Sequence, residues 1–233
     1  MKLSIIIPVF NEKNTVAEIL KRIEAADLGV DKEIIIVDDF STDGTREILK
    51  SYEKKYRVLY HEKNQGKGRA LRSGFTQASG DWAVVQDADL EYDPNDFKIM
   101  LEKARETGAA VIYGSRLFDR KYHYFEGRYS GHIYALGGIF LTWLTNFLYG
   151  TKITDEPTCY KMIKMNLLKS IDLECERFEF CPEITAKIAK RGIKIEEVPI
   201  NYYPRHKNEG KKINWKDGIE AIWTLLKYRF FKS

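Results

Sequence analysis

Residues 33–55 read EIIIVDDFSTDGTREILKSYEKK, an apolar run that ends in two aspartates and is followed by a helical pattern. A continuous apolar run of this kind is typical of a strand buried on both faces. Similar runs recur at 3–10, 57–62, 82–87 and 109–115, with helical patterns between them. The alternation predicts an α/β fold in which a mostly parallel sheet is flanked by helices.

Beyond Arg116 the pattern changes, so residues 1–116 are predicted to form a Rossmann-like nucleotide-binding half and residues 117–233 a C-terminal helical elaboration of the same domain. Residues 132–151 contain no Asp, Glu, Lys or Arg. About 20 such residues could cross a bilayer, but polar and glycine residues interrupt the apolar character. For this segment a core helix and a membrane-surface helix are therefore equal alternatives. One helical stripe is expected to hold the apolar residues Ile133, Leu136, Phe140, Leu144, Phe147 and Leu148.

The rest of the C-terminal half predicts a strand at 159–163, a helix at 182–192, a strand at 195–203 and a last helix at 215–231. The last helix carries an apolar stripe of Trp215, Ile219, Ile222, Trp223, Leu226 and Phe230. Its cations are Lys216, Lys227, Arg229 and Lys232. This combination predicts a helix that binds an anionic membrane surface without crossing it, although packing of Trp223 and Leu226 on the domain is an equal alternative.

Composition excludes several classes of protein. The 38 basic and 34 acidic residues are too balanced for a nucleic-acid-binding protein. The three cysteines, Cys159, Cys175 and Cys181, form no C-x-x-C pair, which argues against a zinc site and against a disulfide framework. The N-terminal MKLSIIIPVFNE is predicted to be a first strand and not a signal peptide. These features favour a cytoplasmic location.

The stretch VVQDADLEYDP, Val84 to Pro94, places acidic residues at every second position. If the chain is extended, Asp87, Asp89, Glu91 and Asp93 face one side at spacings of about 6 to 7 Å, and a cation would offset their repulsion. Asp93 is expected to cap the following helix. The first three follow the carboxyl end of a strand, where α/β sheets bind ligands. Carboxylates without Cys or His favour Mg²⁺ or Mn²⁺ together with a nucleoside diphosphate.

Two other segments are expected at the same edge of the sheet. Asp38 and Asp39 end the second strand and could accept hydrogen bonds from a ribose or a base. Ser41, Thr42 or Asp43 is expected to cap the next helix. The glycines and Lys67 of NQGKGRA, residues 64–70, could approach a phosphate or a base, and a flexible turn is an equal alternative.

Several segments together resemble a known family. They are SIIIPVFNE, IIIVDDFSTDGT, NQGKGRAL, the DAD of Asp87 to Asp89 followed by Glu91, YGSR ending at Arg116, TDEPTCYK, and EVPINYYPR followed by EGKKINWKDG. In this order, and over nearly the whole chain, the sequence is similar to glycosyltransferase family 2 enzymes of GT-A fold. Within that family it resembles the polyprenyl-phosphate sugar synthases related to dolichyl-phosphate mannose synthase.

The resemblance implies roles for individual residues. The nucleoside pocket would be lined by Pro8, Phe10, Glu12, Val37 and Asp39. Asp87 and Ala88 would contact the nucleotide, while Asp89 and Glu91 would hold the metal. The groups facing phosphates would be Arg116, Arg205 and Lys211.

The reaction implied is a metal-dependent, inverting transfer of a hexose from a UDP- or GDP-sugar to a polyprenyl phosphate at the cytosolic membrane face. A phosphate monoester is largely a dianion at pH 7 and needs no general base. A sugar hydroxyl of a glycan or glycolipid is the alternative acceptor; it would need a base, and Asp155 is the candidate by its family position. A non-catalytic nucleotide-sugar-binding module is a further alternative.

One departure from the family pattern concerns the acceptor. Relatives of the mannose synthase can carry arginines for the acceptor phosphate in the helix after the G-S-R motif. Residues 135–150 contain no arginine. Arg128 and His132 are the candidate substitutes.

Overall fold

The computed structural model describes residues 1–118, 132–205 and 214–231, and in residues 132–135 only the backbone. Within these residues one sheet has the strand order β3-β2-β1-β4-β6-β5-β7. The strands are β1 (Lys2–Val9), β2 (Asp31–Asp38), β3 (Arg57–Tyr60), β4 (Trp82–Val85), β5 (Val111–Ser115), β6 (Lys161–Lys164) and β7 (Glu196–Pro199). All neighbours pair in parallel except β6, which is antiparallel to β4 and β5.

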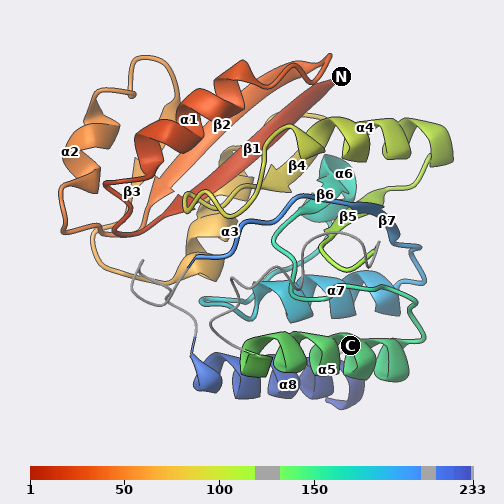
Figure 1. The fold of residues 1–233 in the computed structure, drawn as a ribbon. Coiled ribbons are helices and arrows are strands. Elements are labelled where there is room, and N and C mark those ends of the chain that lie inside the picture. The colour runs from red at the N-terminus through yellow and green to blue at the C-terminus, as the bar shows by residue number, and fades with distance from the viewer. Residues whose placement is uncertain (119–131, 206–213, 232–233) are drawn as a thin grey trace.

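The helices are α1 (Val16–Ala25), α2 (Thr45–Lys50), α3 (Lys67–Gln77), α4 (Asp96–Thr107), α5 (His132–Tyr149), α6 (Met165–Lys169), α7 (Phe180–Lys190) and α8 (Trp215–Phe230). Figure 1 shows helices on both faces of the sheet. The short helix α6 was not predicted from the sequence. Strands from both predicted halves share the sheet, because β6 and β7 pair with β4 and β5.

Successive residues of the central strand β1 pack on opposite helix layers. Ile5 and Ile7 belong to the core cluster formed with α1 and α4, while Ile6 belongs to the cluster formed with α3 and α7. All three are fully buried, which explains why the strand is a continuous apolar run and not an alternating one. Gly74 lets α3 approach the sheet, since a Cβ there would lie 2.4 Å from Ile6 Cγ2. The predicted α/β sheet is confirmed.

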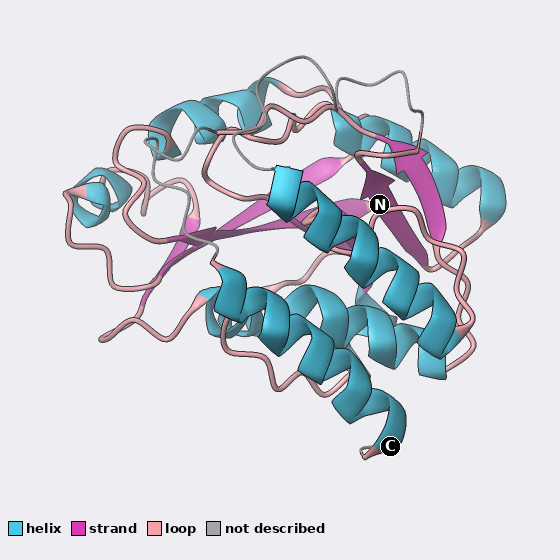
Figure 2. Ribbon diagram, turned by 60° about the horizontal axis from the view of Figure 1, so that its bottom comes forward, coloured by secondary structure: helices cyan, strands magenta, loops and turns pink. Residues whose placement is uncertain are grey.

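The helices α5 and α8 form a third layer beneath α7 (Figures 1 and 2). Leu148 of α5, Ala186 of α7, and Leu225 and Tyr228 of α8 make a small separate core. The Tyr149 hydroxyl also donates to Leu225 O at 2.6 Å, which ties the two outer helices together. The predicted C-terminal helical elaboration is therefore this layer. Among the described residues, no helix is long and apolar enough to span a membrane.

The apolar stripe expected on α5 extends from the packed side of the helix to its exposed side. Leu148 is buried, whereas Phe147 is 73% exposed. The sequence pattern could not separate them because nearly the whole helix surface is apolar. Trp223 of α8 is also exposed and points away from the core that Leu225 enters.

The extended conformation expected for residues 87–93 is also wrong. Leu90 has a φ of 65°, and Asp89 Oδ1 accepts a hydrogen bond from Glu91 N at 3.2 Å, so the chain turns there. Asp93 lies before the helix start: Asn95 is the N-cap residue of α4, and Asp93 Oδ1 accepts from Asn95 N at 3.0 Å. Asp93 therefore caps the turn that leads into α4.

The start of α2 differs in a similar way from the expectation for residues 41–43. The N-cap residue is Gly44, which has a φ of 101°. Asp43 Oδ1 nevertheless accepts from Thr45 N at 3.0 Å, so it satisfies one of the first free amides of the helix.

Candidate active site

The carboxyl ends of β1, β2, β4 and β5 border a cavity of about 800 Å³. Because parallel strands end at the same edge, side chains distant in sequence meet there. The cavity is lined by twelve of the predicted site residues, namely Pro8, Phe10, Glu12, Asp39, Lys67, Asp87, Ala88, Asp89, Glu91, Arg116, Asp155 and Arg205. Val37 instead is fully buried against α3 and does not line it. Lys211 and Arg128 lie outside the described residues, as does the side chain of His132.

Arg205 lies among three carboxylates of the cavity. Its guanidinium nitrogens are 3.2 Å from Glu12, 3.1 Å from Asp89 and 3.7 Å from Glu91. Burial, with the Asp87 and Glu91 carboxylates adding to it, raises the pKa of Asp89 to about 7. Burial and these neighbours thus disfavour the charged form of Asp89, and a further cation next to it would stabilise that form.

Glu91 is engaged differently from Asp89. Its Oε2 accepts from the Tyr202 hydroxyl at 2.7 Å, and its Oε1 accepts from Arg205 N at 3.0 Å. Glu91 thus fixes the chain that follows β7, and this places the Arg205 guanidinium in the cavity.

The residues present fit a divalent cation held jointly with a phosphate ligand. The described residues contain no cluster of three or more His, Cys, Asp or Glu that could hold a metal by themselves. Mg²⁺ usually binds through one or two carboxylates plus substrate phosphates, so a single carboxylate is enough. Asp89, which lines the cavity, is the candidate for that carboxylate, and metal binding by Asp89 stays a prediction. Metal binding by Glu91 stays a prediction.

Lys67 and Asp87 form an ion pair at the floor of the cavity. Lys67 Nζ is 2.7 Å from Asp87 Oδ2. Burial alone would lower the pKa of Lys67, but the Asp87 carboxylate outweighs it and the pKa lies well above the usual value. Burial alone would likewise raise the pKa of Asp87, but Lys67 holds it below the usual value. Both groups are charged at neutral pH, and the lysine faces the ligand space.

Arg116 and Asp155 form a second ion pair, which is bidentate. Arg116 Nε and Nη2 each donate to Asp155 at 2.7 Å, and Arg116 N donates to it at 2.9 Å. Asp155 is 1% exposed. In this arrangement Asp155 positions Arg116, and its role as a catalytic base stays a prediction.

The adjacent residues Asp38 and Asp39 lie in different environments. Asp39 lines the cavity and accepts from Gln65 N at 2.9 Å, Gly66 N at 2.7 Å and His61 Nδ1 at 2.7 Å. It therefore holds the loop that leads into Lys67. Asp38 is fully buried and pairs with Arg46 at 2.7 Å, away from the cavity.

Several lining residues were not predicted. They are Val9, Lys63, Tyr92, Leu117, Gly138, Leu141, Glu156, Pro157, Cys159, Glu176, Arg177, Phe178, Phe180, Cys181, Pro182, Tyr202 and Ala221. Some stand inside segments that carried the family resemblance, such as Cys159 in TDEPTCYK and Tyr202 in EVPINYYPR. Residues 176–178 follow no strand and had no comparable sequence signal.

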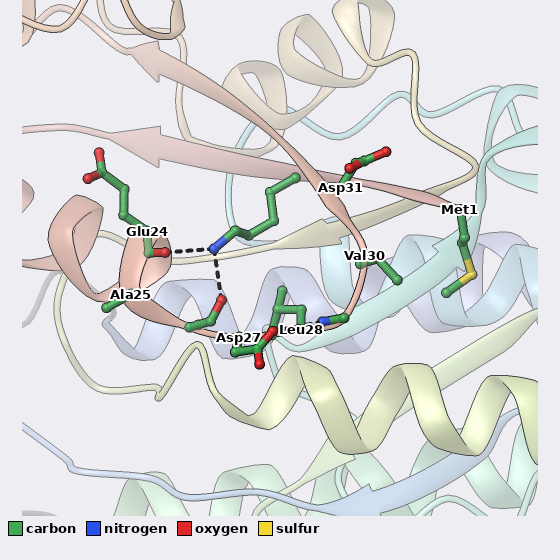
Figure 3. A pocket seen from close by; sticks show the side chains of 10 residues that line it. Met1, Glu24, Ala25, Asp27, Leu28, Val30 and Asp31 are labelled. Atoms are coloured by element: carbon green, nitrogen blue, oxygen red, sulfur yellow. Dashed lines mark hydrogen bonds between the residues drawn. The ribbon is translucent and has the colours of Figure 1, made fainter.

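A second hollow, of about 610 Å³, lies at the amino ends of β1 and β2 (Figure 3). There Lys32 Nζ donates to the main-chain oxygens of Ile23, Glu24 and Ala26, each at 2.8 Å. The lysine satisfies carbonyls at the end of α1, as basic side chains do at helix C-termini. This hollow is explained by a structural role.

The chain matches the family model described as glycosyl transferase family 2 over residues 4–172, and it belongs to that family. A dolichol-phosphate mannosyltransferase of Pyrococcus furiosus is 30% identical over 98% of this chain and 64% of that protein. An undecaprenyl-phosphate 4-deoxy-4-formamido-L-arabinose transferase of Edwardsiella ictaluri is 31% identical over 89% of this chain and 62% of that protein. The chain thus spans less than two thirds of the length of these two relatives.

A solved structure supports the fold. Glucosyl-3-phosphoglycerate synthase of Mycobacterium tuberculosis, in complex with Mn²⁺, UDP and glucosyl-3-phosphoglycerate, has a TM-score of 0.72 and is 21% identical, covering 98% of this chain and 80% of that one. The same enzyme with Mg²⁺ and UDP has a TM-score of 0.71. The predicted GT-A fold and the predicted glycosyltransferase class are confirmed.

Proposed function

We propose that this protein transfers a hexose from a UDP- or GDP-sugar to a polyprenyl phosphate, with inversion at the anomeric carbon and with Mg²⁺ or Mn²⁺ on the donor diphosphate. The observation that carries the proposal is that Asp89 and three basic side chains, Lys67, Arg116 and Arg205, line the same cavity. A carboxylate for a metal and separate cations for phosphates are what a diphosphate donor and a phosphate acceptor together require. Relatives named for polyprenyl-phosphate acceptors favour this acceptor class.

In the proposed reaction an acceptor phosphate oxygen attacks the anomeric carbon while the bond from that carbon to the diphosphate breaks. The bonding electrons leave with the diphosphate, and a divalent metal, when bound, neutralises this charge. Arg116 is held by Asp155 with its guanidinium at the cavity wall, so it is oriented before a phosphate arrives. The acceptor dianion carries no proton that must be removed, so the locked state of Asp155 is compatible with turnover.

A peripheral membrane contact through the outer helix layer is part of the proposal. Large aromatic and aliphatic side chains are exposed on the two adjacent helices: Leu136, Ile139, Phe140, Trp143 and Phe147 on α5, and Trp215, Ile219, Trp223 and Phe230 on α8. The rings of Phe140, Trp143 and Phe147 stack in sequence along α5. Such an aromatic face beside basic residues fits the interface of an anionic bilayer, where a polyprenyl phosphate resides.

Donor binding tests the first part of the proposal. Asp89→Ala should abolish metal-dependent binding of UDP or GDP in calorimetric titrations with Mn²⁺, because it removes the carboxylate next to the diphosphate. The matched control is Asp93→Ala, because Asp93 accepts hydrogen bonds from Asn95 in the turn before α4 and does not line the cavity. An equal loss of affinity in both folded variants would contradict the assignment. Transfer itself is scored by mass spectrometry of the lipid product, from a panel of UDP- and GDP-sugars with a polyprenyl phosphate.

Liposome co-sedimentation tests the membrane part. Combined Trp143→Ser and Trp223→Ser should reduce binding to vesicles that contain anionic lipid, since both indoles are more than half exposed. Asp89→Ala leaves both helices unchanged and serves as the control. Equal sedimentation of the tryptophan variant and the control would remove the membrane role from this face.

A further inference from the structure

The three cysteines occupy two different environments. Cys159 and Cys181 are partly exposed and line the active-site cavity, whereas Cys175 is 2% exposed and belongs to the core beneath α3 and α7. Nothing in the proposed transfer reaction uses a thiol. The two cavity thiols are therefore groups for which the site itself gives no explanation.

Cys159 and Cys181 lie side by side although 21 residues separate them in the chain. Cys181 Sγ is 3.4 Å from Thr158 O, the carbonyl joined directly to Cys159 N. The side chain of each thiol also shifts the pKa of the other. Cys159 Sγ is in turn 3.1 Å from Lys67 Nζ. The pair thus has a neighbouring cation and an opening to the cavity.

Cys181 is the more nucleophilic member of the pair. It is the second residue of α7, an 11-residue helix whose amino end carries partial positive charge. The hydrogen bond from Cys159 lowers the pKa of Cys181 against the opposing effect of burial, and Lys161 and Lys67 add to the lowering. The same hydrogen bond, together with burial, raises the pKa of Cys159, which therefore keeps its proton. Burial and the Glu183 carboxylate raise the pKa of Cys175 strongly.

We propose that Cys181 and Cys159 form a reactive thiol pair that a peroxide converts into a disulfide inside the active-site cavity. The Cys181 thiolate attacks one peroxide oxygen, the O–O bond breaks, and the second oxygen leaves as water after taking a proton. The resulting sulfenic acid is attacked by the Cys159 sulfur, an S–S bond forms, and a second water leaves. Two thiols are oxidised while one hydrogen peroxide is reduced to two waters.

Disulfide formation affects the cavity through Lys67. Bonding to Cys181 pulls the Cys159 sulfur away from Lys67 Nζ and lengthens their contact, which is 3.1 Å in the reduced form, while Lys67 keeps its bond to Asp87. The cation then shifts toward Asp87, and the cavity wall at Cys159 moves toward α7. Oxidation should therefore weaken nucleotide binding. This consequence rests on the proposed function, whereas the oxidation of the thiol pair is independent of it.

The first experiment uses the full chain and measures thiol chemistry alone. Iodoacetamide labelling followed by peptide mass spectrometry should show Cys181 reacting at least about tenfold faster than Cys175, which is the internal control. Treatment with hydrogen peroxide should then give a 159–181 disulfide and leave Cys175 reduced. Equal labelling rates of Cys181 and Cys175, or a failure to form the 159–181 linkage, would overturn the proposal.

Two variants distinguish the role of Cys181, which attacks the peroxide, from that of Cys159, which closes the disulfide. In Cys159→Ser, peroxide should leave a Cys181 sulfenic acid that a dimedone probe traps, with no disulfide. In Cys175→Ala the 159–181 disulfide should form as in the unaltered protein. Dimedone labelling of Cys175 in place of Cys181 would overturn the assignment, and this measurement needs no variant at Cys181 that could fail to fold.

Nucleotide binding tests the consequence for the cavity. Peroxide-treated protein should bind UDP or GDP with Mn²⁺ at least about tenfold more weakly than reduced protein, and dithiothreitol should restore binding. In Cys159→Ser, peroxide treatment should lower the nucleotide affinity less than it does in the unaltered protein. An unchanged affinity of the disulfide form would overturn the link to the cavity, and absence of any nucleotide binding by the reduced protein would instead overturn the proposed function.

Discussion

Replacement of Asp155 by Asn tests the geometry of the site most directly. Asp155 is 1% exposed and accepts two bonds of 2.7 Å from the Arg116 guanidinium and one of 2.9 Å from Arg116 N. In Asp155→Asn the amide NH₂ faces a guanidinium that has only donors, so at least one bond is lost and the buried cation has no counter-charge.

The expected cost follows from the burial of this pair. Breaking a buried ion pair by removing one partner costs about 3 to 5 kcal/mol in the free energy of unfolding. For a chain of this size each kcal/mol lowers Tm by about 2 to 4 °C, so the total decrease should be about 6 to 20 °C. Urea denaturation and differential scanning calorimetry measure the two quantities.

A double-mutant cycle with Arg116→Met distinguishes the pair from a general loss of packing. The double variant should be more stable than Asp155→Asn alone, because no unpaired buried charge remains. A loss below about 1 kcal/mol in Asp155→Asn, or strictly additive losses in the cycle, would refute the interpretation of Asp155 as the residue that holds Arg116.

Three further perturbations have defined outcomes. Glu33→Gln should lower stability at pH 7 but have little effect near pH 2, as urea denaturation at several pH values would show. Hydrogen bonds outweigh burial and lower the pKa of Glu33 to about 2, so the stabilisation by the carboxylate is present above pH 4.5 and lost as the pH falls toward 2. Gly74→Ala should cost about 1 to 3 kcal/mol, since its Cβ would lie 2.4 Å from a β1 side chain, whereas Gly137→Ala in α5 meets nothing within 4 Å and should be neutral or stabilising by up to about 1 kcal/mol in the same assay. Lys67→Met should destabilise the fold by about 3 to 5 kcal/mol because Asp87 is left buried without its cation, and a calorimetric Tm equal to that of the unaltered protein would contradict this.

Twelve residues that the sequence analysis singled out line the cavity, some because they follow strand ends and others through the resemblance to the family. Asp39, Asp87 and Arg116 each follow an apolar run, and parallel strands bring such ends together. The role that the resemblance implied for Val37 was wrong, since the residue lies inside a strand and its side chain packs toward α3 and away from the cavity. The sequence predicted a strand at 159–163, where β6 lies, but not its antiparallel pairing between β4 and β5, which joins segments far apart in the chain.

By itself the sequence determined the α/β class, the sheet edge that binds ligands and the acidic cluster, since apolar periodicity and strand ends are local properties. Only the tertiary structure decided which charges are already paired: Arg116 with Asp155, Lys67 with Asp87, and Arg205 among Glu12, Asp89 and Glu91. It also placed Cys181 Sγ 3.4 Å from Thr158 O, next to Cys159. The physical reason is that ion pairing and the burial that shifts a pKa depend on distances of a few ångströms between segments, and these distances are set by how the helices and the sheet pack.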